Sequence, residues 1–561
     1  MATLSSPVGL SPERPSSTIF GLGQKWLIAA LILYAVVRVA AIPADAESTY
    51  ALTHDSCYLS IVADNVAAGK GFINQAHAIV FLNPDHLPMP YHNGKPLYVV
   101  LMALGPLLFG VSPEYAGLVV SALSTPLLMA GLLMLPLRGM SLAEKLVLAV
   151  FGAHFPSVLQ SSLVLGTDAL LTSFLYCFVA AAFSVDRKRS ALVAGVLLGL
   201  AWLTRSQIML VLPAVLIYFL LKLPAKQAAK RFLVILALGV VVASPWFWRT
   251  KNTFGSFLHS DDSYYLVQDI EGRRFQGDAS FFSTGGNHPP AFASTVVERY
   301  SHSTERPAGL LAIAKRDPAG LLKHIASNIP WISRRLLVHW SEKEYWVLAI
   351  LAGAAALGFS MFRRLYSAEV IAAMVYAATS LPMFAIRGDS FEIRYFGTLG
   401  VLVGLLVGAG FVEAVRLVRS RIRRRDVRLV AVVASGILVV GAIARVAWPA
   451  VQQTYTTFAA RIELEAIARE ADARFARGRP VVVGTKPYYY TRVTGASALS
   501  IPWSSDDYLE SYMKKYGASY LILTEEEQAF WRPNWKSPPS FLQLEGRIGS
   551  AYIYRRVTSH E

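Results

Sequence analysis

Long apolar segments separated by short polar ones recur along the first 450 residues of the chain. Each apolar segment is about as long as the ~20 residues that an α-helix needs to cross a bilayer. The pattern therefore predicts an all-α polytopic membrane protein with about eleven transmembrane helices. We expect these helices near residues 25–43, 115–137, 143–165, 168–185, 190–204, 206–222, 231–249, 345–362, 367–386, 395–415 and 429–448.

The apolar segment at residues 96–111 is shorter than the others and contains Pro106. At ~1.5 Å per residue it reaches ~24 Å, less than the ~30 Å of the hydrocarbon core. We interpret it as a juxtamembrane or re-entrant helix. With that interpretation and a cytoplasmic N-terminus, every basic cluster between spans falls on the cytoplasmic side, as the positive-inside rule requires. These clusters are Arg138 and residues 187–189, 222–231, 363–364 and 416–428.

The polar segments define the expected domains. Residues 1–24, rich in Ser and Pro, are expected to form a disordered cytoplasmic lead-in. A transmembrane domain follows at residues 25–449, with a first external loop at 44–114 that holds juxtamembrane helices and a long external loop at 250–343.

The composition changes from residue 450 onward. Strands are predicted at residues 480–484, 519–523 and 551–555, and they alternate with helices at 458–476 and 506–516. This alternation predicts a small α/β domain at residues 450–561, on the outer side of the membrane.

Composition supports the membrane class. The 561 residues are 54% hydrophobic and only 16% charged, with a mean hydropathy of +0.43, whereas a soluble protein carries roughly a quarter charged residues. A net charge of +16 would suggest nucleic acid as the partner of a soluble chain. Here the arginines lie between apolar segments, which indicates cytoplasmic loops and anionic lipid headgroups instead.

Candidate chemistry begins in the polar stretch between Thr53 and Leu97, just after the first predicted span. Asp55 could take a proton from an acceptor hydroxyl, or it could only cap the helix that follows. Lys95 could hold a phosphate as a point charge, or its ammonium could extend to the interface as an anchor. His92 lies in the same stretch and is a further candidate for substrate binding.

Three more candidates lie at the ends of later spans. Asp168 lies at the start of one span. There it could cap the helix and interact with the helix dipole, or bind a ligand, and the sequence favours neither role. Arg205 lies between two spans and Arg394 just before another, so each could be an interface anchor instead. All these residues fall on the outer side of the predicted topology. A transport pathway would normally leave ionisable groups at mid-depth, so the pattern favours an enzyme at the membrane surface.

No cofactor is predicted from the motifs of the chain. There is no zinc-type Cys/His spacing and no glycine-rich phosphate loop after a strand. Asp261 and Asp262 form one adjacent acidic pair, which lacks the ligand number that a hard cation needs. The sequence neither supports nor excludes a requirement for a divalent cation, and we name no metal ligand.

Several motifs, taken in order, resemble the GT-C superfamily of polyprenyl-phosphate-sugar-dependent glycosyltransferases. The closest resemblance is to the branch of protein O-mannosyltransferases and the lipid A aminoarabinose transferase, from about residue 25 to 415. The first-loop motif is an acidic residue, then Tyr, then Ala-x-Asn and Gly-x-Gly. It is matched by Asp55, Tyr58, Ala63-Asp64-Asn65 and Gly69-Lys70-Gly71. Further matches are Lys95-Pro96-Leu97-Tyr98, Thr167-Asp168, Gly195 to Arg205, Pro245-Trp246 with Arg249 and Asn252, and Arg394-Tyr395.

The chain departs from the family pattern at three places. Ser56 follows Asp55 where many relatives carry a second acidic residue, Leu97 replaces the second Pro of Lys-Pro-Pro, and Thr250-Lys251 separates the usual Arg-Asn pair. The first departure weakens a two-carboxylate or metal mechanism and leaves a single-base mechanism intact.

The resemblance implies inverting transfer of a hexosyl or pentosyl group from a polyprenyl-phosphate sugar to a hydroxyl of a lipid, glycan or protein. Asp55 would be the general base. Tyr58, His92, Lys95, Asp168, Arg205 and Arg394 would bind substrate. The expected location is a bacterial inner (plasma) membrane, with the active site and C-terminal domain outside. Two alternatives remain: a lipid-linked-sugar transporter or flippase, and a noncatalytic protein of envelope assembly.

Overall fold

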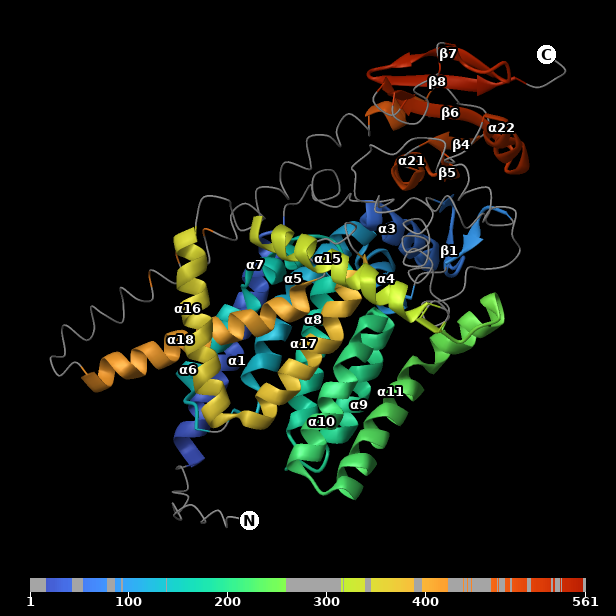
Figure 1. Ribbon diagram of the computed structural model, residues 1–561. Coiled ribbons are helices and arrows are strands. Elements are labelled where there is room, and N and C mark those ends of the chain that lie inside the picture. Colours follow the sequence, from blue (N-terminus) through green and yellow to red (C-terminus); the bar gives the residue numbers. More distant parts are fainter. Residues whose placement is uncertain are drawn as a thin grey trace.

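The computed structural model consists of a helical bundle and a six-stranded sheet at one end of it (Figure 1). The described residues are 17–42, 54–77, 86–91, 94–137, 139–258, 314–315, 317–338, 345–387, 396–421, 437, 441, 445, 466–471, 473, 480–484, 487–501, 506–525, 528–529, 535 and 537–557.

Apart from the helix at Pro318–Val338, which lies within the external loop predicted at 250–343, the bundle is built from helices that coincide with the apolar segments of the sequence. They are α1 (Ser17–Ala40), α5 (Pro113–Leu133), α6 (Leu142–Ala153), α7 (Pro156–Leu163), α8 (Thr167–Phe183), α9 (Ser190–Thr204), α10 (Leu212–Lys222), α11 (Ala225–Phe254), α15 (Pro318–Val338), α16 (Tyr345–Leu365), α17 (Ser367–Arg387) and α18 (Gly397–Arg421). A short 3₁₀ helix, η2 (Ser206–Val211), leads into α10. The helical assignment of these segments is thus confirmed. The segment predicted at 429–448 lies almost entirely outside the described residues.

Three described helices are long and apolar enough to cross a membrane by themselves: Pro113–Leu133, Ala225–Phe254 and Gly397–Val418. The α6–α7 pair, bent by 65° at the break between its two helices, could form a fourth span. The described part of the chain also contains shorter apolar helices of 10–17 residues, among them Thr167–Phe183 and Ser190–Thr204. The total of about eleven spans stays a prediction.

Glycines let several of these helices approach closely. A Cβ at Gly199 of α9 would lie 2.5 Å from the Cβ of Val242 in α11, and one at Gly195 would lie 2.5 Å from the Cβ of Leu238. Small residues at such positions allow van der Waals packing between membrane helices. The glycines of the Gly195–Arg205 motif are therefore needed for the packing of α9 on α11.

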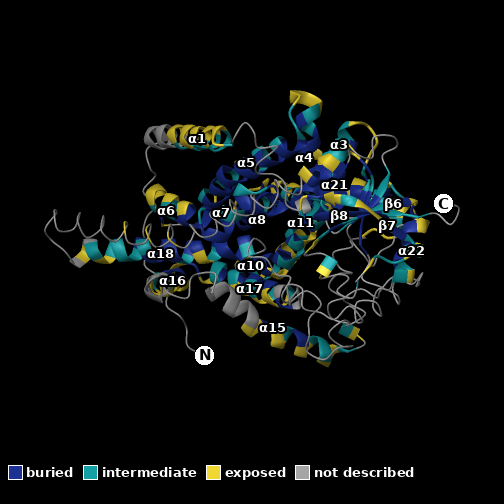
Figure 2. Cartoon of the chain, turned by 90° about the horizontal axis from the view of Figure 1, so that it is seen from above, coloured by how far each residue is buried: buried dark blue, intermediate teal, exposed yellow. Residues whose placement is uncertain are grey.

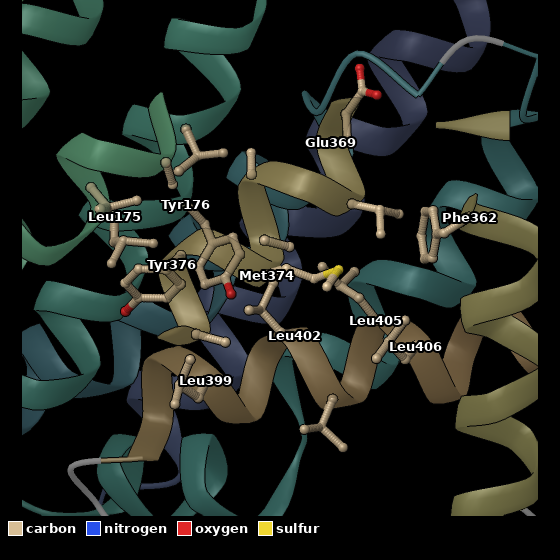
Figure 3. Close-up of a pocket in the computed structure, with 18 of the residues that line it drawn as sticks. Leu175, Tyr176, Phe362, Glu369, Met374, Tyr376, Leu399, Leu402, Leu405 and Leu406 are labelled. Carbon is tan, nitrogen blue, oxygen red and sulfur yellow. The ribbon is translucent and has the colours of Figure 1, made fainter. Parts of the chain in front are cut away.

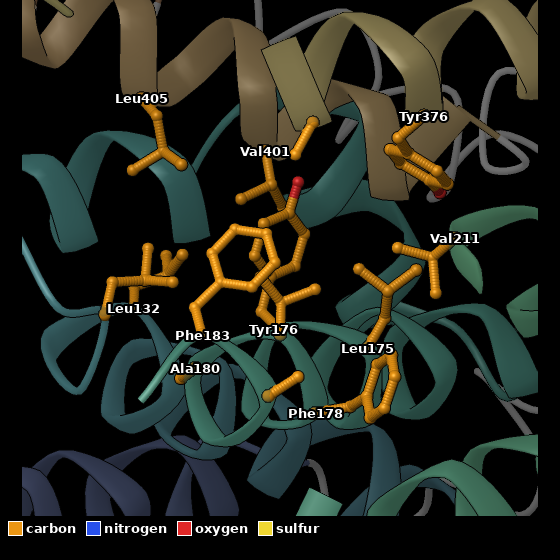
Figure 4. Close-up of a cluster of buried hydrophobic side chains, with 14 of the residues drawn as sticks. Leu132, Leu175, Tyr176, Phe178, Ala180, Phe183, Val211, Tyr376, Val401 and Leu405 are labelled. Atoms are coloured by element: carbon orange, nitrogen blue, oxygen red, sulfur yellow. The ribbon is translucent and has the colours of Figure 1, made fainter. Parts of the chain in front are cut away.

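The core of the bundle is a large apolar cluster around α8 (Figure 4). Leu175 and Phe178 are almost completely buried there, together with Ile208 and Val215 from η2 and α10. Figure 2 shows the burial concentrated in α5, α7 and α8, with exposed residues along α1 and α6. This distribution is typical of helices whose outer faces contact lipid.

The first external loop forms its own small elements. These are α3 (His54–Ala67), β1 (Ile73–Asn74), β2 (Ala76–His77), β3 (Met89–Pro90), α4 (Pro96–Leu104) and the π-helix η1 (Gly105–Phe109). The segment 96–111 is therefore helical, but too short to span unaided. In Figure 1, α3 and α4 lie at the end of the bundle opposite to the α10–α11 connection.

The sheet has the strand order β2-β5-β4-β6-β8-β7. β2, β5, β4 and β6 are parallel, and the β6–β8 and β8–β7 pairs are antiparallel. The elements from the C-terminal part are β4 (Val481–Gly484), α21 (Pro487–Thr494), β5 (Ala498–Ser500), α22 (Asp506–Lys515), β6 (Ala518–Thr524), β7 (Leu542–Ile548) and β8 (Ala551–Arg556). We did not predict β7, β5 or α21.

An unexpected feature is that β2, from the first external loop, forms the edge strand of this sheet. Ala76 pairs with Ala498 and His77 with Leu499. The sheet therefore joins residues that are more than 400 positions apart, and the predicted boundary at residue 450 does not enclose it. An independent external domain at 450–561 stays a prediction.

Candidate functional site

Helix α3 carries the candidate base. Its first residues are His54 and Asp55, so Asp55 lies in the first helical turn. The side chain of Asp55 lies outside the described part of the structure. The following residues, Cys57, Leu59 and Val62, are buried. Because α3 is held by this apolar face, the backbone that carries Asp55 has a fixed position rather than the freedom of a surface loop.

Tyr58 follows Asp55 by nearly one helical turn and packs among aromatic rings. Its ring centroid lies 5.4 Å from that of Tyr91 and 4.9 Å from that of Tyr488 in α21. The residue is only 5% exposed. Packing within this cluster is thus its observed role, and substrate binding by Tyr58 stays a prediction.

Arg249 binds the two ends of the segment that runs from Phe72 to Tyr91. Its guanidinium donates to the carbonyl oxygen of Tyr91 at 2.9 Å and to that of Phe72 at 3.0 Å. It also lies over the ring of Trp246, 4.5 Å from the centroid, a cation–π arrangement. The backbone immediately before His92 is therefore anchored to α11. His92 itself lies outside the described residues.

Lys95 is half-buried at the N-terminus of α4, where Pro96 begins the helix. One turn further, the Tyr98 hydroxyl donates to the Gly117 carbonyl at 2.9 Å and accepts from the Gly166 amide at 3.0 Å. Tyr98 is completely buried. Tyr98 therefore connects the Lys95-Pro96-Leu97-Tyr98 motif, called the Lys95 motif below, to Gly166, the residue before Thr167-Asp168.

Asp168 and Arg205 form a buried ion pair between their carboxylate and guanidinium groups. Both side chains are 8% exposed. Asp168 lies in the first turn of α8, where the helix dipole also favours a negative charge, and Arg205 is the residue at which α9 ends. Removal of one partner from a buried pair typically costs ~3–5 kcal/mol. The structure thus brings these two candidates, 37 residues apart in the chain, into direct contact.

Arg394 lies outside the described residues, which resume at Phe396. The start of α18 contacts α8: a Cβ at Gly397 would lie 3.3 Å from the Thr172 hydroxyl oxygen. Tyr176 donates to the Thr398 carbonyl at 2.8 Å. The segment that follows Arg394 is therefore packed one to two turns from Asp168.

Arg492 of α21 connects the C-terminal part of the chain to the first loop and α5. Its guanidinium donates to Asp64 of α3 at 2.7 Å and forms two hydrogen bonds with the Glu114 carboxylate, one of them at 2.7 Å. Burial lowers the pKa of Arg492, but the hydrogen bond and charge of Glu114, with the charge of Asp64, outweigh it and raise the pKa. Burial raises the pKa of Asp64, which Arg492 partly offsets. Arg492 therefore stays protonated.

Sequence reasoning missed both Arg249 and Arg492 as candidates for the site. Arg249 carried a signal, because it belongs to the Pro245-Trp246 motif. Arg492 carried none, since its partners Glu114 and Asp64 are 378 and 428 residues away in the sequence.

An apolar pocket with a volume of about 430 Å³ lies among α8, α17 and α18 (Figure 3). Tyr176, Tyr376 and Leu399 line it, and Glu369 lies at its margin. Such a pocket can hold part of a hydrocarbon chain. Tyr176 belongs to α8, whose first turn contains Asp168, so the pocket and the ion pair share one helix.

No group of three or more His, Cys, Asp or Glu residues in the described part of the chain is placed to hold a metal ion.

Comparison with known proteins gives one family domain and one curated relative. Residues 91–248 match the family model of dolichyl-phosphate-mannose-protein mannosyltransferases. A stretch of 118 residues is 35% identical to the lipid A galacturonosyltransferase RgtD of Rhizobium johnstonii. That match covers 20% of this chain and only 24% of the length of the relative.

Two solved structures share the fold. The apo ArnT of Cupriavidus metallidurans is 12% identical, with a TM-score of 0.52 over 96% of this chain and 99% of that one. The oligosaccharyltransferase of Archaeoglobus fulgidus is 13% identical, with a TM-score of 0.55 over 89% of this chain and 69% of that one. These comparisons confirm the resemblance to the GT-C superfamily of membrane glycosyltransferases, with the matched family domain at residues 91–248.

Proposed function

We propose that this protein transfers a sugar from a polyprenyl-phosphate donor to a hydroxyl acceptor at the outer face of the membrane. One observation carries the proposal. The Lys95 motif, Asp168 and Arg205 were each predicted from a separate segment, and Tyr98 and the ion pair connect those segments at one end of the bundle. The family model over residues 91–248, whose members are named for a dolichyl-phosphate donor, supports the same donor class.

In the proposed reaction the acceptor oxygen attacks the anomeric carbon of the donor sugar. The bond between that carbon and the phosphate oxygen breaks, and polyprenyl phosphate leaves with the bonding electrons. Asp55 takes the hydroxyl proton of the acceptor as general base. Attack from the face opposite to the leaving phosphate inverts the anomeric configuration.

Negative charge on the phosphate grows as the glycosyl bond breaks. Lys95 and Arg205 are the described cations that we place beside it, and Arg394 is the third candidate. Preplaced charges of this kind typically contribute several kcal/mol, because they need no reorganisation during the reaction. Asp168 keeps the guanidinium of Arg205 oriented through the ion pair.

The apolar pocket among α8, α17 and α18 would receive part of the polyprenyl chain. Its lining is almost entirely apolar, and it lies within the bundle. The acceptor would approach from the side of α3, where the first loop meets the sheet. The partial likeness to a lipid A galacturonosyltransferase supports a lipid acceptor among the three classes of acceptor, lipid, glycan and protein.

A panel of radiolabelled polyprenyl-phosphate sugars, incubated with the purified protein and a membrane extract, tests this proposal. A transferase consumes one donor, releases polyprenyl phosphate and labels a component of the extract. A transporter or flippase would bind the donor without consuming it, and a noncatalytic protein would do neither. Binding without turnover across the whole panel would contradict the proposal.

A further inference from the structure

The sheet and the first external loop are connected more closely than two adjacent domains would need to be. Besides the β2–β5 pairing, Asn65 of α3 exchanges two amide hydrogen bonds with Gln75, at 2.8 and 2.9 Å. Gln75 precedes β2, and its carbonyl accepts from the Ala498 amide of β5 at 3.3 Å. A movement of the sheet edge would therefore be transmitted directly to α3.

An ion pair at the residue before Asn65 also connects α3 to the C-terminal part of the chain. Asp64, next to Asn65, shares the guanidinium of Arg492 with Glu114. The Glu114 side chain is 2% exposed and the Asp64 side chain 42%. Glu114 therefore depends on Arg492 for compensation of a buried charge, whereas Asp64 retains contact with water.

Aromatic packing completes the junction between α21 and α3. Tyr488 and Tyr489 of α21 belong to the same buried cluster as Tyr58, Tyr91 and Trp246. Three kinds of contact thus hold α3 from the side of the sheet: strand pairing, an ion triad and an apolar cluster. Asp55 lies at the start of this helix, nine residues before Asp64.

We propose that Arg492 is a positioning residue, which fixes α3 through Asp64 and Glu114 so that the carboxylate of Asp55 meets the acceptor hydroxyl. This inference rests on the proposed function. In the proposed reaction Arg492 does not contact a substrate. The C-terminal part of the chain would then affect the turnover rate, because it holds α3, the helix that carries Asp55. The affinity for the donor would depend instead on Lys95 and Arg205.

The test uses the full chain in proteoliposomes and combines kinetics with amide hydrogen exchange over residues 54–67. Arg492→Ala is expected to lower kcat roughly ten- to a hundredfold, because small misplacement of a reacting group can cost about a hundredfold. The KM for the donor should stay within about twofold. Exchange in 54–67 should become faster, while exchange in α8 and α9 stays unchanged.

Three further variants separate positioning from stability. In Arg492→Ala with Glu114→Gln the uncompensated buried charge is gone, so the unfolding midpoint should recover while kcat and the protection of 54–67 do not. Arg547→Ala breaks the exposed Arg547–Glu525 pair of the same sheet and should change none of the measured quantities. Arg492→Lys should give intermediate kcat, since an ammonium cannot reproduce the forked contacts.

Full recovery of kcat in the double variant would overturn the inference, because stability alone would then explain the single variant. Unchanged exchange over 54–67 in the double variant would overturn it as well. If the wild-type protein transferred no sugar, the proposed function would fail, but the exchange data would still show whether Arg492 holds α3. The two failures are therefore distinguishable.

Discussion

Lys95 differs from the other candidate cations in its surroundings. Arg205 is paired with Asp168, and Arg249 is occupied by two carbonyl oxygens. No described residue forms a hydrogen bond or ion pair with Lys95, which is half-buried at the start of α4. Its charge is therefore available to a phosphate at a position that Tyr98 fixes relative to Asp168.

Lys95→Ala should lower kcat/KM for the donor by about a hundredfold, the typical loss when one preplaced donor of this kind is removed. The unfolding midpoint should not change, because Lys95 has no described partner to lose. The measurement is donor turnover together with thermal unfolding in detergent.

Lys70→Ala is the matched control, since Lys70 is an exposed lysine of the same external loop. It should leave turnover unchanged. Equal turnover of Lys95→Ala and wild type would show that Lys95 is only an interface anchor.

At the scale of residues, the sequence identified Asp168 and Arg205 as two separate candidates and did not predict that they form an ion pair. Asp168 and Arg205 were recognised from their places at span ends, but nothing in the sequence paired them. Arg492 could not be recognised at all, because its role arises from carboxylates brought together by tertiary structure.

At the scale of elements, α9 and α11 are held together through glycines rather than through interlocking large side chains. Gly199 lies against Val242, and Gly195 lies against Leu238. α9 ends at Arg205 and α11 carries Arg249, so both arginines depend on this packing for their positions.

Gly199→Val should therefore destabilise the bundle by about 1–3 kcal/mol, the usual cost of overpacking. Turnover should also fall, because Arg205 and Arg249 move apart. The thermal midpoint in detergent and donor turnover measure the two effects.

Gly353→Val is the control, because a Cβ at this helical position of α16 has no atom within 4 Å. It should have little effect on either quantity. A midpoint for Gly199→Val equal to that of the control would contradict close packing of α9 on α11.

The elements also show where prediction from the sequence ends. Helical segments in the bundle and the strands β4, β6 and β8 were found, because their apolar runs are long enough to carry a pattern. Strands β2 and β5, with two and three residues, are too short for any periodicity. β7 was missed because most of its residues are exposed or half-buried, with buried residues only at its two ends.

At the scale of the whole molecule, the chain is arranged around one end of the bundle. The first loop, the starts of α4, α8 and α18, and the ends of α9 and α11 meet there, and the six-stranded sheet covers α3 (Figure 1). The sequence predicted the gathering of these segments from hydropathy and basic clusters. It did not predict that the first loop and the C-terminal part share one sheet, because strand pairing over such a separation leaves no local signal.

The role of Asp55 as general base is tested by the transfer activity of Asp55→Asn in proteoliposomes, with the donor from the panel that the wild-type protein consumes. Asparagine keeps the size of the side chain and its capping capacity but cannot accept the acceptor proton as a base. We expect normal insertion of this variant, an unchanged unfolding midpoint and loss of transfer by at least about a hundredfold. Transfer by Asp55→Asn at a rate near that of the wild type would contradict the role of Asp55 as general base.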